Sequence, residues 1–217
     1  MKNTIQTLLI ILSILSINVT LAVENDAALD AEELHSIINP PSTAALNIMV
    51  GALSSLKELR KQGHASPENV RKLINIKLLP NISMVDSTRL ALIGHWNSLN
   101  DEQRQLFQRY ITHALIKDYA GALGSYKDFD SVNISVGEHV KRKDNRAIVK
   151  LEITLGNDPI PFKITLNMVR SDHWRIYDVK FSGVSMIKTY RAQFNSHVKR
   201  KGLDSLIEKI EKKLTKG

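Results

Sequence analysis

The sequence contains no cysteine and few aromatic residues. Without cysteine, the chain can form no disulfide framework, no thiolate metal site and no cysteine nucleophile. Aromatic residues make up 6% of the 217 residues, whereas 43% of the residues are hydrophobic. A large apolar surface in this protein must therefore come from leucine, isoleucine and valine. Such a surface suits aliphatic ligands better than stacked rings.

Two kinds of ligand-binding motif are also missing. The seven histidines are His35, His64, His95, His113, His139, His173 and His197. They occur singly, whereas metal sites need clustered ligands at set spacings, so we expect no metal. Gly121 and Gly124 lie in or at the end of a predicted helix, without the preceding strand and following lysine of a phosphate-binding loop. We therefore expect no cofactor.

The chain is basic, with a formal net charge of +8, and this charge favours anionic partners. Basic runs occur at Lys141–Lys143 and Lys199–Lys201. A third basic group near the carboxy terminus comprises Lys209, Lys212, Lys213 and Lys216. No aromatic residues interleave with these charges, so we expect no nucleic-acid partner. Two interpretations stay open: a solvated surface, or a docking patch for an anionic membrane or an acidic partner.

Residues 1–22 have the three parts of a secretory signal peptide. Lys2 is followed by the apolar stretch Ile5–Val19 and by the small-x-small cleavage site Thr20–Ala22. A membrane anchor would need about 20 apolar residues, and polar residues interrupt this stretch. We therefore expect cleavage, with residues 23–217 exported as one soluble domain.

Apolar residues recur at helical spacing on both sides of a central β region. Before the β region we expect four helices. The first follows Ser42 and ends at Gly63, the second is capped by Ser66 and runs to Pro80, the third is short and opened by Asp86, and the fourth is long and capped by Asn100, with Gln103 in the capping-box position. After the β region we expect one helix that follows Ser185 and ends at Gly202, and a last one capped by Asp204.

From Asp130 the pattern changes to strict alternation, which predicts strands. The four expected strands cover residues 132–136, 149–155, 160–168 and 174–181. Short turns join them, so we expect a curved four-stranded antiparallel sheet whose face is covered by helices. The predicted fold class is α+β.

The last of these strands carries apolar residues in both alternating sets. One face should hold Trp174, Ile176 and Asp178, and the other Arg175, Tyr177, Val179 and Phe181. Such a strand needs cover on both sides, and Gly183 then lets the chain turn.

Two strand carboxylates, Glu152 and Asp178, are the candidates for catalysis. A buried acid whose pKa is raised can act as a general base. No histidine or second acid lies at a suitable spacing. We therefore interpret Glu152 as a solvated strand residue and Asp178 as a hydrogen-bonding anchor beside the Gly183 turn.

Several short motifs then resemble one family. They are LALIGHW at Leu90–Trp96 with Gln103 and Phe107 downstream, Tyr119–Leu123, WRIYDV at Trp174–Val179, GVSMI at Gly183–Ile187, YRAQF at Tyr190–Phe194, and Gly202–Asp204 with Leu206. In this order and spacing they resemble the MlaC family of periplasmic phospholipid carriers, also called toluene-tolerance proteins. The likeness covers nearly the whole chain after the leader.

The resemblance implies a cone with an apolar cavity, similar to the nuclear transport factor fold with extra helices. It implies a periplasmic, monomeric, non-enzymatic carrier that holds phospholipid acyl chains inside and the headgroup near solvent. Its expected partners are an inner-membrane ABC transporter complex and an outer-membrane lipoprotein/porin complex, between which it shuttles lipid to maintain outer-membrane asymmetry. The alternative is a small-molecule enzyme on a related cone, with Asp178 as general base.

The lipid would need a dry aliphatic chamber. We expect its lining to come from Val149, Leu151, Ile153, Ile164, Leu166, Tyr177, Val179 and Phe181, with Tyr110 and Tyr119 opposite. Each of these residues could instead belong to an ordinary hydrophobic core.

Overall fold

The computed structural model describes residues 40–125, 131–137, 140–156 and 161–215, apart from the side chains of residues 118–125 and 155. In this part of the chain, six α-helices pack with one antiparallel sheet, and the expected α+β class is confirmed. No helix among these residues is long and apolar enough to span a bilayer. The amino-terminal leader predicted from sequence lies outside the described residues.

The helices are α3 (Pro41–Lys61), α4 (Pro67–Leu73), α5 (Met84–Ala91), α6 (Asp101–Ser125), α7 (Met186–Lys201) and α8 (Leu203–Thr215). Short π and 3₁₀ turns lie at Ile74–Leu78, Leu79–Asn81 and Trp96–Ser98. The strands are β1 (Val132–Val136), β2 (Lys141–Lys143), β3 (Arg146–Leu155), β4 (Phe162–Arg170), β5 (Trp174–Phe181) and β6 (Val184–Ser185).

Two helices begin at the caps expected from the sequence, whereas α5 and α8 begin at Met84 and Leu203, before the expected Asp86 and Asp204, which lie inside the first turns. The Asn100 side chain accepts a hydrogen bond from the backbone N–H of Gln103 at 2.8 Å, and the Gln103 side chain accepts one from the N–H of Asn100 at 3.0 Å. This reciprocal pair is a capping box, and it satisfies two N–H groups that the first turn of α6 leaves free. Ser66 caps α4 in a similar way, with Pro67 in the first helical position.

The sheet contains two more strands than the sequence pattern predicted. Its strands are ordered β1-β3-β4-β5-β6, and β2 pairs with β3 as well. The strand β2 is the run Lys141–Lys143, whose charged residues give no apolar alternation to recognise. The strand β6 has two residues and follows a tight turn in which Ser182 and Gly183 have φ values of 47° and 83°. The position Ile160, expected to open the third strand, lies outside the described residues.

A β-bulge at Tyr177 corrects the expected faces of β5. Asn167 pairs with Asp178 and Met168 pairs with Ile176, so Tyr177 has no partner of its own on β4. Neighbouring residues of β4 point to opposite faces. Ile176 and Asp178 therefore lie on opposite faces of the sheet, although strict alternation placed them together.

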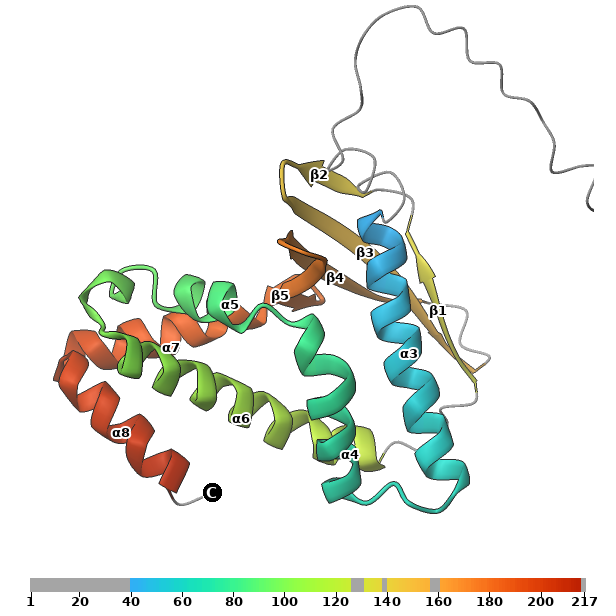
Figure 1. The fold of residues 1–217 in the computed structure, drawn as a ribbon, viewed down its shortest axis with the longest axis horizontal. Coiled ribbons are helices and arrows are strands. Elements are labelled where there is room, and N and C mark those ends of the chain that lie inside the picture. The colour runs from blue at the N-terminus through green and yellow to red at the C-terminus, as the bar shows by residue number, and fades with distance from the viewer. Residues whose placement is uncertain (1–39, 126–130, 138–139, 157–160, 216–217) are drawn as a thin grey trace, which may run out of the picture. The chain divides into compact units, whose positions relative to one another are not determined.

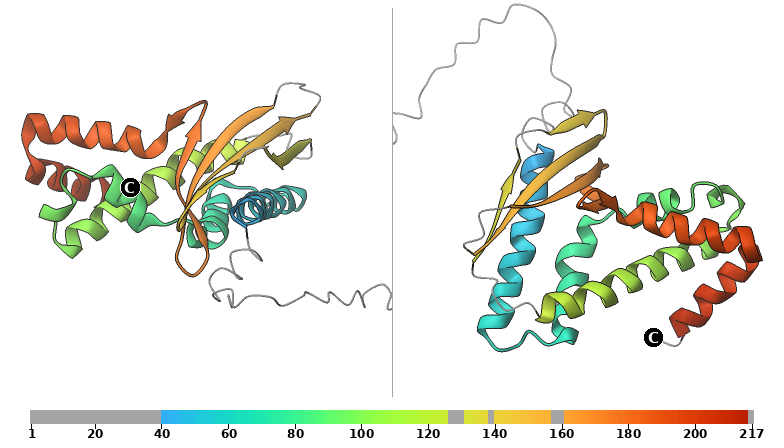
Figure 2. Two further views of the ribbon diagram at one scale, coloured as in Figure 1. Left: turned by 90° about the horizontal axis from the view of Figure 1, so that it is seen from above. Right: turned by 180° about the vertical axis from the view of Figure 1, so that it is seen from behind.

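The bulge gathers the apolar residues of β5 on a single face. The members of this cluster from β3, β4 and β5 include Val149, Leu151, Ile164, Leu166, Met168, Trp174 and Ile176, with Val179 and Phe181 packed against them. Helix α3 covers this face with Ala44, Ala45, Ile48 and Met49, as Figure 1 and the view from behind in Figure 2 show. The apolar residues of β5 therefore need cover on one face, which α3 supplies, and not on both faces as strict alternation predicted.

A second core lies among α5, α6, α7 and α8, beside the β5 edge of the sheet (Figure 1). It is built around Phe107, Ile111, Phe194, Leu206 and Ile210. Helix α5 is tied to the bulge, because the hydroxyl of Ser87 donates to the Tyr177 carbonyl at 2.8 Å. The helical group is therefore anchored at the point where the sheet changes register.

Candidate ligand-binding groove

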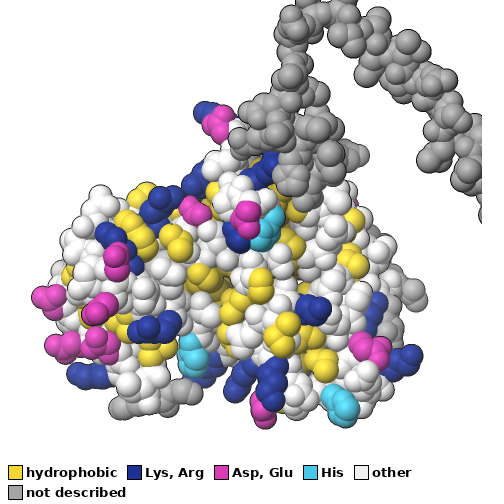
Figure 3. Space-filling view, in the orientation of Figure 1, with side chains coloured by type: hydrophobic (Ala, Val, Ile, Leu, Met, Phe, Trp, Pro, Cys, Tyr) yellow, Lys and Arg dark blue, Asp and Glu magenta, His cyan; other side chains and the backbone are white. Residues whose placement is uncertain are grey.

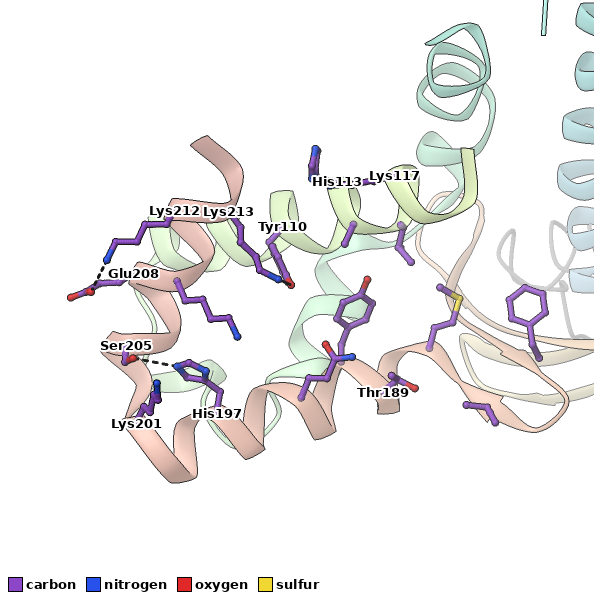
Figure 4. Close-up of a pocket in the computed structure, with 18 residues that line it drawn as sticks. Tyr110, His113, Lys117, Thr189, His197, Lys201, Ser205, Glu208, Lys212 and Lys213 are labelled. Carbon is purple, nitrogen blue, oxygen red and sulfur yellow. Dashed lines mark hydrogen bonds and ion pairs between the residues drawn. The ribbon is translucent and has the colours of Figure 1, made fainter. Parts of the chain in front are cut away.

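A groove of about 990 Å³ lies between α6, α7 and α8 and extends to the β5–β6 hairpin (Figure 4). Its volume is at the upper end of the range of about 300 to 1,000 Å³ found for ligand pockets. The three helices contact one another around the second core, and side chains above that core line the groove.

One part of the groove is apolar. Its apolar lining comprises Tyr110, Ala114 and Leu115 of α6, Phe181 of β5, Val184 of β6, and Met186 and Tyr190 of α7. Tyr110 and Tyr190 both pack on Phe194, with ring centroids 6.2 Å and 5.9 Å from its own. The core below thus fixes the two tyrosine rings that line the groove.

The other part of the groove is basic. Four lysines line it, against the single carboxylate of Glu208: Lys201, Lys209, Lys212 and Lys213. A fifth lysine of the groove, Lys117, lies farther along α6, beside His113 (Figure 4). Lys212 lies 3.6 Å from Glu208. Lys213 donates to the Tyr110 hydroxyl at 3.4 Å, and its ammonium lies 5.6 Å from the centre of that ring. An anion in this part of the groove would therefore meet several ammonium groups and one carboxylate.

His197 lies where α7 meets α8, at the same end of the groove as Lys201 and Ser205 (Figure 4). Its ring is buried, and its Nε2 lies 3.3 Å from the Ser205 hydroxyl. Burial, together with the positive charges of Lys209, Lys201 and Arg200, lowers the pKa of His197 below its ordinary value. The imidazole is therefore neutral at neutral pH.

Asp178 makes a structural junction behind the groove. Its carboxylate accepts hydrogen bonds from Ser185 Oγ at 2.7 Å, Asn167 Nδ2 at 3.1 Å and the Ile187 backbone N–H at 3.1 Å. The Ser185 hydroxyl in turn caps α7 by accepting from the Lys188 N–H at 3.0 Å. A buried carboxylate with three donors is committed to holding β5, β6 and α7 together, and this geometry favours the anchor interpretation over the general base.

Glu152, the other candidate acid, lies 3.3 Å from Lys163 on the neighbouring strand. Their side chains are 37% and 71% exposed, in keeping with a solvated pair on the face away from α3. In the described residues, no group of three or more His, Asp or Glu side chains lies close enough to hold a metal ion.

The groove brings together two of the ten lining residues expected from sequence, Tyr110 and Phe181. Four of the others are buried in the core beneath α3: Val149, Leu151, Ile164 and Leu166. Ile153 and Val179 are partly buried at the edge of the same cluster. Contact between these residues and a ligand stays a prediction.

The remaining two expected residues lie elsewhere. Tyr177 is at the bulge, with the guanidinium of Arg146 5.0 Å from the centre of its ring. Tyr119 falls within α6, and its side chain is outside the described part of the structure.

Sequence reasoning missed most of the groove. Met186 and Tyr190 belong to the family motifs, and Leu115 belongs to the apolar repeat of the long helix that Asn100 caps. Such a repeat does not distinguish residues above a core from residues inside it. The available signal was the basic run at the carboxy terminus. Its position along α8 places lysines opposite the Tyr110 turn of α6.

The fold resembles that of a solved ligand-binding protein. The structure of the phospholipid-binding protein from Ralstonia solanacearum, in complex with a phospholipid, superposes with a TM-score of 0.69 and covers 79% of this chain and 95% of that chain. Sequence identity is 22%, so the likeness shows a shared fold.

The sequence comparisons define the family. Residues 48–212 match the family model described as MlaC protein, and the chain therefore belongs to the MlaC family. One relative is the intermembrane phospholipid transport system binding protein MlaC of Haemophilus influenzae, with 24% identity over 149 residues, 67% of this chain and 68% of the relative. Another is the toluene tolerance protein ttg2D of Pseudomonas putida, with 25% identity over 154 residues, 70% of each chain.

Proposed function

We propose that this protein is a carrier that binds a phospholipid with its acyl chains against the apolar part of the groove. The observation that carries this proposal is the meeting of two surfaces in one groove: an apolar lining around Leu115, Met186 and Tyr190, and a lysine-rich end. Such a pair matches an amphiphile with hydrocarbon chains and a phosphate. The phospholipid bound to the Ralstonia protein and the name of the Haemophilus relative support it.

The energetics of lipid transfer explain why a carrier needs this groove. A phospholipid carries on the order of 30 methylenes, and each costs about 0.8 kcal/mol to expose to water. Unaided passage through water would therefore cost roughly 20 kcal/mol or more. A groove lined by aliphatic and tyrosine side chains lowers that cost by covering the chains.

The proposed route follows from family membership. The carrier acts as a monomer in the periplasm after cleavage of residues 1–22, and it exchanges lipid with an inner-membrane ABC transporter complex and an outer-membrane lipoprotein/porin complex. It thereby maintains the lipid asymmetry of the outer membrane. The family match and the names of the relatives support this route, and the charge and apolar pattern of the leader support export. A mature amino terminus that still begins at Met1 would contradict the export step.

Extraction of the purified protein under denaturing conditions, followed by mass spectrometry, tests lipid binding. We expect phospholipid in stoichiometric amount. The variant Ala114→Trp places an indole in the groove from α6, and we expect it to lose most of the bound lipid while its circular dichroism spectrum is unchanged.

The matched control is Gln105→Trp, an exposed position on the same helix that does not line the groove. It should keep the lipid of the unmodified protein. An unmodified protein without lipid would refute the proposed ligand. Equal lipid in both tryptophan variants would refute the proposed location.

A further inference from the structure

We infer that the lysines of α7 and α8 select the ligand by its headgroup, so that the groove prefers phospholipids with a net negative headgroup over zwitterionic ones. This inference rests on the proposed function, because it assigns the headgroup to the lysine-rich end of the same groove. The residues that carry it are Lys201 on α7 and Lys209 and Lys213 on α8.

The charge at this end of the groove is poorly compensated within the part of the chain that the structure describes. Glu208 is the one carboxylate among the lining residues, and it pairs with Lys212. Asp204 and Glu211 also belong to α8, but neither lines the groove. Figure 3 shows further acidic side chains at the end of the molecule where α6 and α8 begin, and Asp101 and Glu102 occupy the first turn of α6. The lysines of the groove are thus left to attract an external anion.

Helix dipoles account for part of this arrangement. The last turn of α7 contains Lys201 and that of α8 contains Lys213, where positive charge stabilises a helix. Lys209 lies outside the last turn of α8, however, and Lys117 comes from α6. Dipole compensation therefore does not explain why lysines from three helices face one groove.

His197 lies at the same corner of the groove as Lys201 and Ser205 (Figure 4). The positive charges of Lys209 and Lys201 both contribute to lowering its pKa, so both ammonium groups act on the same corner of the groove. His197 and Ser205, which lie 3.3 Å apart, offer further polar atoms there. A phosphate in this corner would meet positive charge and hydrogen-bonding groups together.

The chemistry of the headgroup then decides the preference. Every glycerophospholipid has a phosphate that the lysines can attract. A zwitterionic headgroup also carries an ammonium or quaternary ammonium, which the same lysines repel. An anionic headgroup such as phosphatidylglycerol has no cation, so it gains the attraction without the repulsion.

A competition experiment on the full-length mature protein tests the inference. Delipidated protein is incubated with equimolar phosphatidylglycerol and phosphatidylethanolamine of identical acyl chains, and the bound lipids are measured by native mass spectrometry. We expect phosphatidylglycerol to be enriched roughly five- to tenfold at low salt, because lysines near an anionic lipid each add modest attraction. The enrichment should shrink as salt rises from about 0.05 M to about 0.5 M.

The variant Lys209→Gln/Lys213→Gln removes two of the charges, and Lys141→Gln/Lys143→Gln removes two exposed charges on β2 as the matched control. We expect the first variant to lose phosphatidylglycerol more than phosphatidylethanolamine, so that the enrichment falls to about twofold or less. The control should keep both the amount of bound lipid and the full preference. Inorganic phosphate alone, added as a competitor, should not displace the lipid, because the acyl chains supply most of the binding energy.

The outcomes separate this inference from the proposed function. The inference is overturned if the protein binds lipid without headgroup preference, or if the preference survives in the Lys209→Gln/Lys213→Gln variant. Neither result would contradict the proposed carrier function. A variant that loses binding to anionic vesicles while its bound-lipid preference is unchanged also overturns it, since the lysines would then serve the membrane surface. Absence of any bound lipid refutes the carrier itself.

Discussion

At the scale of single residues, the carboxylate of Asp178 joins the last long strand to the helix that forms one wall of the groove. Its three donors are Asn167 on β4, Ser185 on β6 and the backbone of Ile187 in α7. Asp178 and Ser185 both belong to the sequence motifs that first indicated the family. The junction gives a physical reason for these residue types, because a shorter or uncharged side chain could not satisfy all three donors.

Replacing Asp178 by alanine should therefore destabilise the fold. The substitution leaves three donors without their acceptor in a buried site, and we expect a loss of about 2–4 kcal/mol in the free energy of unfolding. Urea titration followed by circular dichroism measures this loss. Asp101→Ala, at an exposed position whose side chain is 85% accessible, is the control and should cost far less. Equal losses in the two variants would contradict the anchor role.

His197 makes a prediction about pH. The pKa of His197 is lowered in the folded protein, whereas in the unfolded chain it returns to about 6.5. Below that value the unfolded chain binds the proton more readily, so this group destabilises the fold as the pH falls toward the folded pKa. We expect urea midpoints to fall between about pH 7.5 and about pH 5.5, and to fall less in His197→Gln. Parallel pH profiles of the two proteins would contradict this role for His197.

At the scale of elements, the β5–β6 hairpin depends on an unusual backbone. Gly183 has a φ of 83°, and an added Cβ there would meet nothing within 4 Å. Alanine at this position should cost about 1 kcal/mol through backbone strain alone. Gly51 lies in the middle of α3 and is equally uncrowded, so alanine there should instead stabilise the protein by about 0.5–1 kcal/mol. Thermal unfolding of the two variants checks the opposite signs, and shifts of the same sign would contradict the assigned turn.

Elements with a local signal could be predicted from the sequence. The capping pair of Asn100 and Gln103, the cap at Ser66 and the alternation of β3 each depend on neighbours in the chain, and each is found in the structure. The bulge at Tyr177 could not be predicted. The bulge is fixed by the pairing of β5 with β4. Strict alternation therefore assigns every β5 residue on one side of the bulge to the wrong face of the sheet.

The lining of the groove likewise depends on contacts between distant parts of the chain, and most of it could not be predicted from the sequence. Phe181 was expected in the lining because it is apolar, and so were Leu151 and Ile164, which the structure places in the core under α3. A sequence pattern tells that a residue is buried, and the packing of α6, α7 and α8 decides which apolar side chains remain at a surface. The lysines of α8 were noticed as a charge run, but their place beside Tyr110 depends on how α8 folds back along α6.

At the scale of the whole molecule, the described part of the chain places the proposed lipid groove apart from the core under the sheet. The sheet packs its apolar face under α3, and the helices α5–α8 have a core of their own. The groove lies on the helical core and touches the sheet at the β5–β6 hairpin. Changes in its lining should therefore alter ligand binding at smaller cost to folding than changes beneath α3.

Photo-cross-linking can show whether the groove between α6, α7 and α8 holds the phospholipid. A benzophenone amino acid is placed at Met186, which lines this groove, or at Ile76, which is 68% exposed and lines a separate apolar groove between α3 and the turn after α4. After illumination of the protein purified with its lipid, mass spectrometry should find phospholipid adducts at Met186 and none at Ile76. Adducts at Ile76 alone would contradict this location of the phospholipid.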